Sequence, residues 1–502
     1  MKRATILLFG ILIAASAFRF YNAPLRYGIG DDSSRDAFVA ITGARDLQLP
    51  LTGPFSSLGP FTFGPWYYWQ LIAATLLLRT PYASWIYMGV ASLLFVLIMY
   101  ALGKRLFDTR FGLILATLAA LSPPEISTAK GLTNPNLIPL FAGLSIYLFF
   151  ILIQQKKLND RIPFLWGLVV GIGINTHYQM VGYLMFFPLL LSYRKEKFRT
   201  LFWSGLGLFV SFIPMLFFEL TNHWYTTRNM FVYATLTKNL YYVPYRWLWY
   251  IRDFWPEFWS HSLGLPKFAS TPVILGFIMT VFWDVRKKQF PKFFIPFFVV
   301  FSANFLWLRY YWGQRFFGYL LYLHPFIFIF TAYVIWKLII APKTKIVGLL
   351  SFLILVVAIL PAGLRELPAD YPNAQARKST RAIKEFFPDK QFRIYSCKRH
   401  DFSRTIAVAF LLSTENRLSE DGIALGFWDA DCSYPPTQSV NQFGQIPVIK
   451  QLESVYPNIP STSLVNLSHA TPSALVQSGW GDPITPRRIF ESTVRWWFRE
   501  QP

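Results

Sequence analysis

Charged residues are scarce in this sequence. Only 15% of the 502 residues are Asp, Glu, Lys or Arg, whereas 54% are hydrophobic and 19% are aromatic. A soluble domain of this composition would leave large apolar areas in water, but a lipid bilayer accommodates them. The scarcity of charge excludes an ordinary soluble enzyme and predicts a multi-pass membrane protein.

Acidic residues are fewer still. The chain has 26 Asp and Glu against 48 Lys and Arg, which gives a formal net charge of +22. The basic residues fall in short clusters between apolar runs and do not form the single patch expected of a nucleic-acid-binding protein. We interpret them as topology signals, and no nucleic-acid partner is expected.

Apolar stretches long enough to cross ~30 Å of hydrocarbon recur along the chain. They cover residues 4–20, 85–102, 111–125, 136–153, 162–176, 178–192, 201–219, 272–284, 292–308, 319–340 and 346–362. The predicted fold class is therefore an all-α polytopic membrane protein with about eleven transmembrane helices and additional juxtamembrane helices.

A twelfth apolar stretch, 66–78, is rich in tryptophan and tyrosine. If it does not cross, the basic clusters that begin at Lys2, Lys104, Lys156, Arg194, Arg286 and Lys337 all share one side of the membrane. The positive-inside rule assigns that side to the cytoplasm. We predict that 66–78 lies in the outer interface of a plasma-membrane protein or enters the membrane partway, with a cytoplasmic N-terminus and an extracytoplasmic C-terminus.

Lys2 and Arg3 before an apolar stretch also fit a signal peptide. A signal peptidase requires small residues, whereas the chain has the bulky run Phe18-Arg19-Phe20-Tyr21. We favour a retained anchor.

This topology places the unusual polar segments on the outer face: 21–84, 127–136, 175–179, 220–271, 309–318 and everything after about 363. A transporter or channel more often buries ionisable groups within its spans and shows repeated halves or broken helices. Neither pattern is apparent in the sequence, which favours a site at the membrane surface.

The sequence divides into a transmembrane domain, 1–362, and an extracytoplasmic domain, 363–502. Strand-like and helical runs alternate in the second part, which predicts a small α/β domain. It contains both cysteines of the chain, Cys397 and Cys432. They form either a disulfide or two unpaired buried thiols.

The stretch Gly30-Asp31-Asp32-Ser33-Ser34-Arg35-Asp36 directly follows the first apolar segment. Asp32 is a good N-cap for a helix over 33–47, on which Asp32 and Asp36 share a face with Arg35 alongside. Such a carboxylate acts as a general base or in a metal site. Alternatively, Asp32 only caps the helix and Arg35 pairs with a carboxylate in solvent.

The order of these features resembles the GT-C superfamily of polyprenyl-phosphate-dependent glycosyltransferases. The nearest branch is similar to glycosyltransferase family 39, which contains protein O-mannosyltransferases and lipid A aminoarabinose transferases. In that family an Asp-Glu pair precedes an arginine, an aromatic residue and an alanine. Here Asp32, Arg35 and Ala37 match this pattern, whereas Ser33 and Asp36 depart from it. The resemblance implies that Asp32, which stands at the position of the catalytic aspartate of the family, or one of its neighbours Asp31 and Asp36, is the catalytic carboxylate.

Further similarities follow in the same order over roughly residues 1–340. Gly64-Pro65-Trp66-Tyr67-Tyr68-Trp69 looks like a Pro-Leu-Tyr-Tyr-Trp segment of the family, and Lys104–Asp108 resembles its basic inner turn. Thr133–Asn136 stands where the family has a polar outer turn, and Tyr310–Pro325 resembles its late arginine-tyrosine-proline segment.

The predicted substrate-binding residues are Arg35, Asn134, Asn136, His177, Gln179, Arg228, Arg309 and Arg315. Arginine makes bidentate contacts with phosphate oxygens, and His177 and Gln179 offer hydrogen bonds to a phosphate or sugar. His177 is alternatively a structural residue at a helix end. Glu219 and His223 are possible metal ligands, or they orient the loop that follows.

The basic residues Arg228, Lys238, Arg246 and Arg252 alternate with aromatic ones in this outer loop. This pattern fits an interfacial helix beside a lipid groove, or an aromatic belt without a ligand.

The resemblance implies transfer of a hexose or pentose from a polyprenyl-phosphate donor to a hydroxyl on a protein, lipid or glycan at the outer face. Direct displacement would invert the anomeric centre. The sequence has neither a Walker-type glycine loop nor a dinucleotide fingerprint, which agrees with a lipid-linked donor; a divalent metal stays open. The alternatives are a lipid-linked glycan polymerase or ligase, a flippase, or a transport or structural protein.

Overall fold

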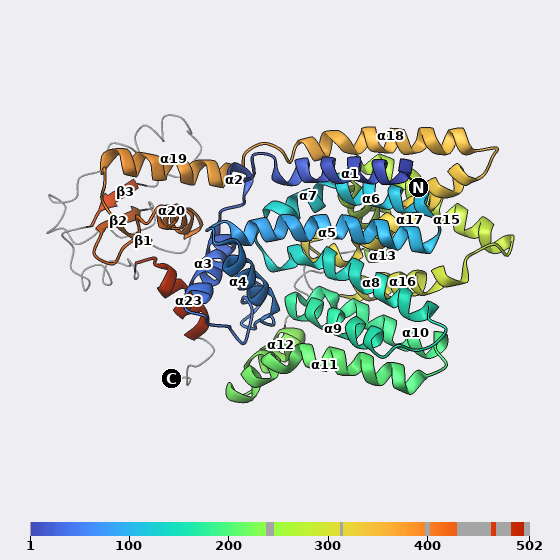
Figure 1. The fold of residues 1–502 in the computed structure, drawn as a ribbon, viewed down its shortest axis with the longest axis horizontal. Coiled ribbons are helices and arrows are strands. Elements are labelled where there is room, and N and C mark those ends of the chain that lie inside the picture. Colours follow the sequence, from blue (N-terminus) through green and yellow to red (C-terminus); the bar gives the residue numbers. More distant parts are fainter. Residues whose placement is uncertain are drawn as a thin grey trace.

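The computed structural model describes residues 2–236, 245–311, 315–396, 402–428, 463–467 and 483–495. A bundle of long helices occupies most of the molecule, and a smaller mixed α/β part lies beyond one end of it (Figure 1). The N-terminus lies toward the other end of the bundle. This arrangement confirms the predicted fold class.

Eight helices in the described part of the chain are long and apolar enough to cross a membrane. They are α1 (Lys2–Phe20), α5 (Ala83–Leu106), α8 (Ile138–Gln154) extended by the 3-10 turn η1 (Asn134–Leu137), α11 (Lys197–Thr221), α15 (Lys267–Arg286), α16 (Ile295–Tyr310) preceded by η4 (Lys292–Phe294), α17 (His324–Ile340) preceded by η6 (Leu321–Leu323), and α18 (Lys345–Leu364).

A ninth span is broken. Helices α6 (Thr109–Leu121) and α7 (Pro123–Lys130) pass the same test together but meet at 56°. Two more predicted stretches are shorter helices: α9 (Arg161–Thr176), and η2 (Tyr178–Met185) followed by α10 (Phe186–Tyr193). Sixteen residues of α9 rise only about 24 Å, less than a bilayer core. Eight of the eleven predicted spans, or nine with the bent pair, therefore meet this test by length and composition, and all eleven stretches are mostly helical.

The expectation that no broken helix or buried ionisable group interrupts the spans is wrong. Besides the bend between α6 and α7, Arg19, Glu125 and His324 are each at most 1% exposed inside the bundle. The bend lies at Pro123 and Pro124 and is stabilised by the distant Arg19. It does not interrupt the run of hydrophobic residues, so the hydrophobic pattern alone does not reveal it.

The first loop forms α2 (Ala23–Arg26), α3 (Asp31–Arg45) and α4 (Trp66–Leu78). Gly30, and not Asp32 as predicted, is the N-cap of α3. Its extended backbone lets its carbonyl accept the Ser34 N–H at 2.8 Å, while the Asp32 side chain turns to Arg35. Helix α4 packs against α3 and α5, and its interfacial position in a membrane stays a prediction.

The long outer loop is also helical where it is described. It contains α12 (Tyr225–Leu236), α13 (Arg246–Trp249), the π-helical turn η3 (Tyr250–Phe254) and α14 (Trp255–Leu263). The connection between α16 and α17 carries η5 (Phe317–Tyr319). These elements surround the site described below.

The C-terminal part has the predicted α/β character. It contains α19 (Tyr371–Phe386), β1 (Phe392–Ser396), α20 (Phe402–Thr414), β2 (Ile423–Trp428), β3 (Ser463–Asn466) and α23 (Pro486–Arg495). The described sheet has the order β1-β2-β3, with β1 parallel to β2 and β2 antiparallel to β3. Cys397 and Cys432 lie outside the described residues, so their pairing stays a prediction.

This C-terminal part holds the first loop. Helices α20 and α23 pack against α3, and the Phe410 ring lies 5.7 Å from Phe38 and 5.2 Å from Trp85. Buried Asn373 of α19 donates hydrogen bonds to the carbonyls of Pro24 and Tyr27. Helix α3 is therefore fixed from two sides, by α4 and by the C-terminal part.

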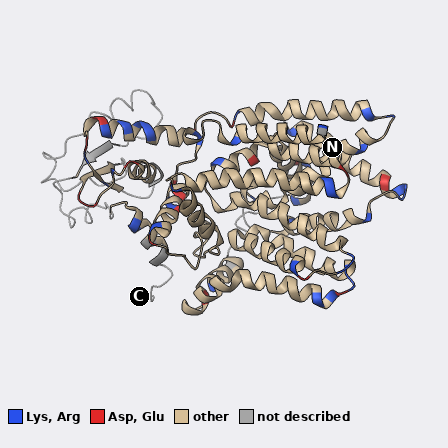
Figure 2. Cartoon of the chain, in the orientation of Figure 1, with Lys and Arg blue, Asp and Glu red and all other residues tan. Residues whose placement is uncertain are grey.

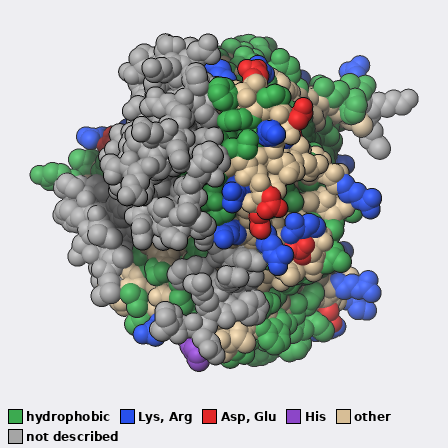
Figure 3. Space-filling model, turned by 90° about the vertical axis from the view of Figure 1, so that its left-hand side faces the viewer, with side chains coloured by type: hydrophobic (Ala, Val, Ile, Leu, Met, Phe, Trp, Pro, Cys, Tyr) green, Lys and Arg blue, Asp and Glu red, His purple; other side chains and the backbone are tan. Residues whose placement is uncertain are grey.

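Charge is distributed toward the two ends of the bundle. Lysines and arginines gather at the end away from the C-terminal strands (Figure 2). The opposite end presents acidic and basic side chains side by side on its described surface (Figure 3). The apolar helices between them have exposed faces, as a lipid-facing surface requires.

Candidate functional site

A cavity of about 740 Å³ lies where α3, the loop 54–63, η1, the end of α9, α12 and the α16–α17 connection meet. Seven of the predicted site residues line it: Asp32, Arg35, Asp36, Asn134, His177, Gln179 and Arg315. Asp31, Asn136, Arg228, Arg309, Glu219 and His223 are not among its lining residues. The cavity thus brings together residues from six separate segments of the chain.

Arg35 organises the acidic side of the cavity. Its Nε and Nη2 donate to Asp36 Oδ1 at 2.9 and 2.8 Å, and its Nη1 donates to Asp32 Oδ1 at 2.6 Å. The Tyr68 hydroxyl donates to the same Asp36 oxygen at 2.9 Å. The side chain of Asp36 is 1% exposed, whereas that of Asp32 is 63% exposed. Asp32 is therefore the accessible carboxylate, and the buried Asp36 holds the Arg35 side chain by two hydrogen bonds.

Burial and neighbouring charges shift the pKa values of Asp36 and Arg35. It raises the pKa of Asp36 to about 6, although Arg35 opposes the shift. The pKa of Arg35 is raised, because Asp36, Tyr68 and Asp32 together outweigh the loss of hydration. Asp31, which precedes the pair, has a pKa raised by burial and by the neighbouring Asp32. Arg35 thus stays charged while Asp36 titrates close to neutral pH.

His177 forms part of a stack of three rings. Its imidazole lies 4.7 Å from the Phe63 ring and 5.2 Å from the Tyr319 ring, with interplanar angles of 23° and 26°. The Gln179 N–H donates to His177 Nδ1 at 3.4 Å. Burial lowers the pKa of His177 to about 3, so the ring is neutral at physiological pH. The three rings form an uncharged, aromatic part of the cavity wall.

The predicted amide side chains have different roles. Asn134 Nδ2 donates to the Thr176 carbonyl at 2.7 Å, and Gln179 Oε1 accepts the Tyr322 N–H at 3.3 Å. Gln179 Nε2 is buried without a partner among the described residues. Asn136 Nδ2 donates to the Gly131 carbonyl at 2.9 Å, which stabilises the turn outside the cavity.

Arg315 contributes the cation on the other side of the site. Its Nε donates to the Leu308 carbonyl at 3.1 Å and its Nη2 to the Tyr311 carbonyl at 2.6 Å, at the end of α16. Burial lowers the pKa of Arg315, and the charges of Arg246 and Arg309 add to this. An anion beside Arg315 would relieve that repulsion.

The two other predicted arginines lie apart from the cavity lining. Arg309 is 7% exposed and its guanidinium lies 4.9 Å from the Trp247 ring centre. Arg228 is exposed on α12. Lys238 lies outside the described residues.

Of the two roles predicted for Glu219, the structure shows the one in which it orients the following loop. Its two carboxylate oxygens accept the backbone N–H groups of Thr226 and Thr227 at 2.9 and 3.0 Å, at the start of α12. These bonds fix the turn through His223, which has a positive φ of 53°. No group of three or more His, Cys, Asp or Glu suited to a metal occurs in the described part of the chain. The metal role of Glu219 and His223 is not supported.

The fold is shared with known glycosyltransferases. The structure of ArnT from Cupriavidus metallidurans in the apo state matches with a TM-score of 0.57 at 11% identity, over 93% of this chain and 99% of ArnT. The same enzyme bound to undecaprenyl phosphate matches with a TM-score of 0.58 at 12% identity, over 92% and 97%. The chain has the GT-C fold.

A second GT-C protein matches over a shorter length. The oligosaccharyltransferase of Archaeoglobus fulgidus in complex with Zn and sulfate matches with a TM-score of 0.51 at 14% identity, over 76% of this chain. The match spans 56% of the length of that enzyme. The chain therefore spans a little over half of the length of that enzyme.

The sequence also matches the family of dolichyl-phosphate-mannose-protein mannosyltransferases over residues 64–238. No curated protein matches the chain significantly in sequence. These matches confirm the predicted resemblance to the GT-C superfamily. The matched region begins after α3 and does not include Asp32, so the assignment of a catalytic carboxylate stays a proposal.

Sequence analysis missed two aromatic residues that support the site: Tyr319 lines the cavity, and Tyr68 lies behind its lining. Tyr68 holds Asp36, and Tyr319 stacks on His177 while its hydroxyl contacts Ser57 Oγ at 3.0 Å. The signal for Tyr68 was its place in the aromatic segment that resembles the family. Nothing in the sequence distinguishes Tyr319 from the other aromatic residues of an aromatic-rich chain.

Proposed function

We propose that the protein is a membrane glycosyltransferase that moves a sugar from a polyprenyl-phosphate donor to a hydroxyl acceptor at the outer face of the plasma membrane. The single observation that carries the proposal is one cavity lined by the accessible carboxylate of Asp32, the flat stack around His177 and the guanidinium of Arg315. General base, sugar surface and phosphate partner are the groups that this transfer needs.

The donor phosphate is assigned to Arg315. Its Nε and Nη2 bind carbonyls of the described chain, and we assign the remaining nitrogen, Nη1, to the phosphate because Arg315 lines the cavity. A guanidinium stabilises the departing phosphate because the negative charge on that group grows as its bond to the sugar breaks. The polyprenyl class of the donor is supported by the GT-C structure solved with undecaprenyl phosphate.

Asp32 is assigned as general base. It accepts the proton of the acceptor hydroxyl as the acceptor oxygen bonds to the anomeric carbon and the bond from that carbon to the phosphate oxygen breaks. Attack from the face opposite the phosphate inverts the anomeric centre. Arg35 holds Asp32 in place, and Asp36 holds Arg35. Asp31 lies at the start of α3 and is not part of this step.

Arg35 is the cation bound to the described carboxylates of the site, and the proposal assigns no step to a divalent metal. Asp32 and Asp36 both share their Oδ1 atoms with the cationic Arg35, which repels a second positive charge. The proposed mechanism therefore uses protein residues alone.

The outer location rests on the distribution of charge. The basic end of the bundle lies away from the C-terminal part (Figure 2), as the positive-inside rule requires of a cytoplasmic side. The cavity is lined in part by α3, against which α20 and α23 of the C-terminal part pack, and we place that C-terminal part outside the membrane. An acceptor then reaches Asp32 from the extracytoplasmic side, where we propose that the C-terminal part contributes to its recognition.

The test is release of sugar from a radiolabelled polyprenyl-phosphate hexose by the purified protein in lipid nanodiscs. Asp32→Asn removes the base, and we expect turnover to fall about 10²- to 10⁴-fold with donor binding retained. Asp46→Asn is the matched control, because Asp46 is a solvent-accessible aspartate at the opposite, C-terminal end of the same helix and pairs with Arg45 outside the cavity. Full turnover of Asp32→Asn contradicts the assigned base. Failure of the native chain to bind or turn over hexose, pentose or aminopentose donors favours the flippase or transport alternative.

A further inference from the structure

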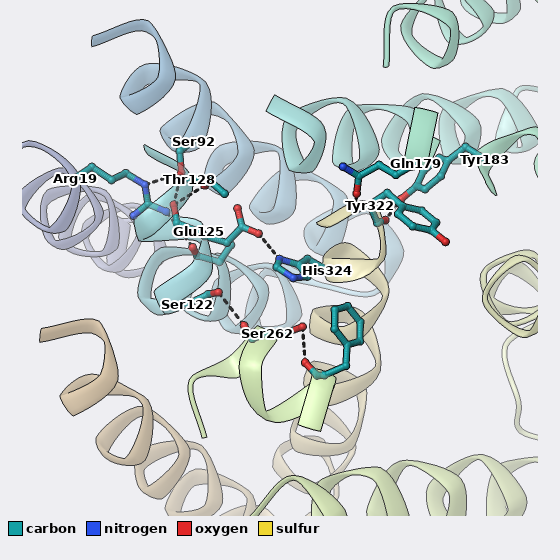
Figure 4. Close-up of polar contacts among 12 residues, drawn as sticks. Arg19, Ser92, Ser122, Glu125, Thr128, Gln179, Tyr183, Ser262, Tyr322 and His324 are labelled. Carbon is teal, nitrogen blue, oxygen red and sulfur yellow. Dashed lines mark hydrogen bonds and ion pairs between the residues drawn. The ribbon is translucent and has the colours of Figure 1, made fainter. Parts of the chain in front are cut away.

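A buried polar cluster lies at the break between α6 and α7 (Figure 4). Pro123 and Pro124 have no N–H group, so the carbonyls of Ala119 and Ala120 lose their helical partners. Arg19 of α1 replaces both bonds: Nη2 donates to Ala119 at 3.1 Å and Nη1 to Ala120 at 3.0 Å. The break is thus stabilised by a distant residue and has a defined direction.

Glu125 follows the two prolines and points to His324 at the start of α17 (Figure 4). Its Oε1 lies 2.6 Å from His324 Nδ1, and both side chains are at most 1% exposed. Arg19 lies on the other side of Glu125, linked through Ser92, whose Oγ accepts from Arg19 Nε and donates to the Glu125 carbonyl. Ionisable groups are costly to bury inside a membrane bundle, so such a pair marks a functional position.

The α17 side of this pair continues directly into the cavity wall. Tyr322, two residues before His324, lines the cavity. Its N–H donates to Gln179 Oε1, its carbonyl accepts from the Tyr183 hydroxyl at 2.8 Å, and its own hydroxyl donates to Asn304 Oδ1 at 3.2 Å. The η6 turn is therefore fixed at Tyr322 by three bonds and at its following end by His324.

The α7 side leads to a different part of the wall. Helix α7 ends at Lys130, and the next residues Thr133, Asn134 and Pro135 line the cavity at η1. The bond between Glu125 and His324 consequently joins two elements that each deliver cavity residues, α7 with η1 and α17 with η6. Neither residue of the pair is among the lining residues.

We infer that Glu125 and His324 are positioning residues that hold the η1 and η6 walls of the cavity together and thereby set the affinity for the donor. The inference rests on the proposed function for its donor, but the wall geometry itself does not depend on it. Loss of the bond leaves the base and Arg315 in place and loosens the surface against which the donor packs.

The experiment compares three variants in nanodiscs. His324→Phe removes the nitrogen that bonds Glu125 and keeps a ring of similar size. His324→Asn retains a nitrogen that can hydrogen-bond Glu125 near the position of Nδ1. Tyr333→Phe is the matched control, because Tyr333 lies on the same helix and its hydroxyl bonds buried Asp284 away from the cavity. We expect His324→Phe to raise KM for a polyprenyl-phosphate hexose about tenfold with kcat within about twofold, and the other two variants to keep the native KM.

Hydrogen exchange provides a readout without turnover. We expect the amides of 317–323 to exchange faster in His324→Phe and at the native rate in Tyr333→Phe. Native exchange and native KM in His324→Phe would overturn the inference, as would equal effects in both variants. If the native chain binds no lipid-linked sugar, the proposed function fails, while exchange still decides whether the pair fixes the walls. Should His324→Phe not fold, Glu125→Met, which removes the hydrogen-bonding oxygens at similar side-chain length, takes its place, with the same expected effects on KM and on exchange.

Discussion

At the scale of residues, the site separates two carboxylates by burial. Asp32 and Asp36 are four positions apart on one helix and both bind Arg35, yet one is accessible and the other is enclosed. Helical spacing predicts the shared face but not the difference in exposure, because Tyr68 and the packing of α4 enclose only Asp36. The enclosed carboxylate has the raised pKa, and the accessible one is free to meet an acceptor.

The raised pKa of Asp36 predicts a pH-dependent stability. The value of about 6 lies above the ordinary 3.8, so the folded protein binds more protons than the unfolded chain between about pH 4 and 6. The contribution of Asp36 to the free energy of unfolding is therefore greatest below pH 4 and falls as pH rises through 6. Asp36→Asn lacks this titration. Thermal unfolding at pH 4.5 and 7.5 should show the native chain losing stability relative to the variant at the higher pH, and a constant difference would contradict the prediction.

A second residue-scale prediction concerns the stack around His177. His177→Ala removes the middle ring between Phe63 and Tyr319 and should raise the donor KM about tenfold, since each ring contact contributes about 0.5–1.5 kcal/mol. His177→Phe preserves the stack and should retain most of the affinity. Steady-state kinetics with both variants distinguish a stacking role of His177 from a hydrogen-bonding role. A hydrogen-bonding role predicts that His177→Ala and His177→Phe raise the donor KM equally.

At the scale of elements, helix α3 depends on partners that are far away in sequence. Phe410 of α20 is fully buried between Phe38, Tyr82 and Trp85. The C-terminal part therefore supports the helix that carries Asp32, in addition to any contact it makes with an acceptor.

Replacing Phe410 tests this support. Phe410→Ala should destabilise the protein by about 3–5 kcal/mol, as expected for a buried phenylalanine, and should lower kcat because α3 loses its packing surface. The control is Phe386→Ala, since Phe386 is 46% exposed on α19. Thermal unfolding and turnover measured below the lower melting temperature check both effects. Full turnover of the folded Phe410→Ala protein would limit the C-terminal part to another role.

At the scale of the whole molecule, the structure arranges a basic end, an apolar middle and an end that carries the cavity loops and the α/β part (Figures 2 and 3). This order is what a membrane enzyme with an outer site requires. Of the eleven predicted spans, only α9 and the η2–α10 pair are shorter than the length test for a membrane span requires.

The orientation predicts which side of a cell reacts with an impermeant thiol reagent. In a background with Cys397→Ser and Cys432→Ser, Asp389→Cys should be labelled in intact cells, because the Asp389 side chain is 98% exposed in the C-terminal part. Lys157→Cys, in an exposed turn between α8 and α9, should be labelled only after the membrane is permeabilised. The reverse pattern would place the cavity on the cytoplasmic side.

The sequence by itself determined the membrane class, the helical bundle, the C-terminal α/β part and the resemblance to GT-C enzymes, because composition, hydrophobic length and local motifs are read within one segment. It also indicated Asp32, Arg35, Asp36, Asn134, His177, Gln179 and Arg315, which line the cavity. Only the tertiary structure decided that Asp36 is enclosed, that Glu219 caps α12 and that Arg19 completes the bonds of a broken helix. Each of these depends on contacts between residues distant in sequence or on burial by other elements, and no local pattern contains that information.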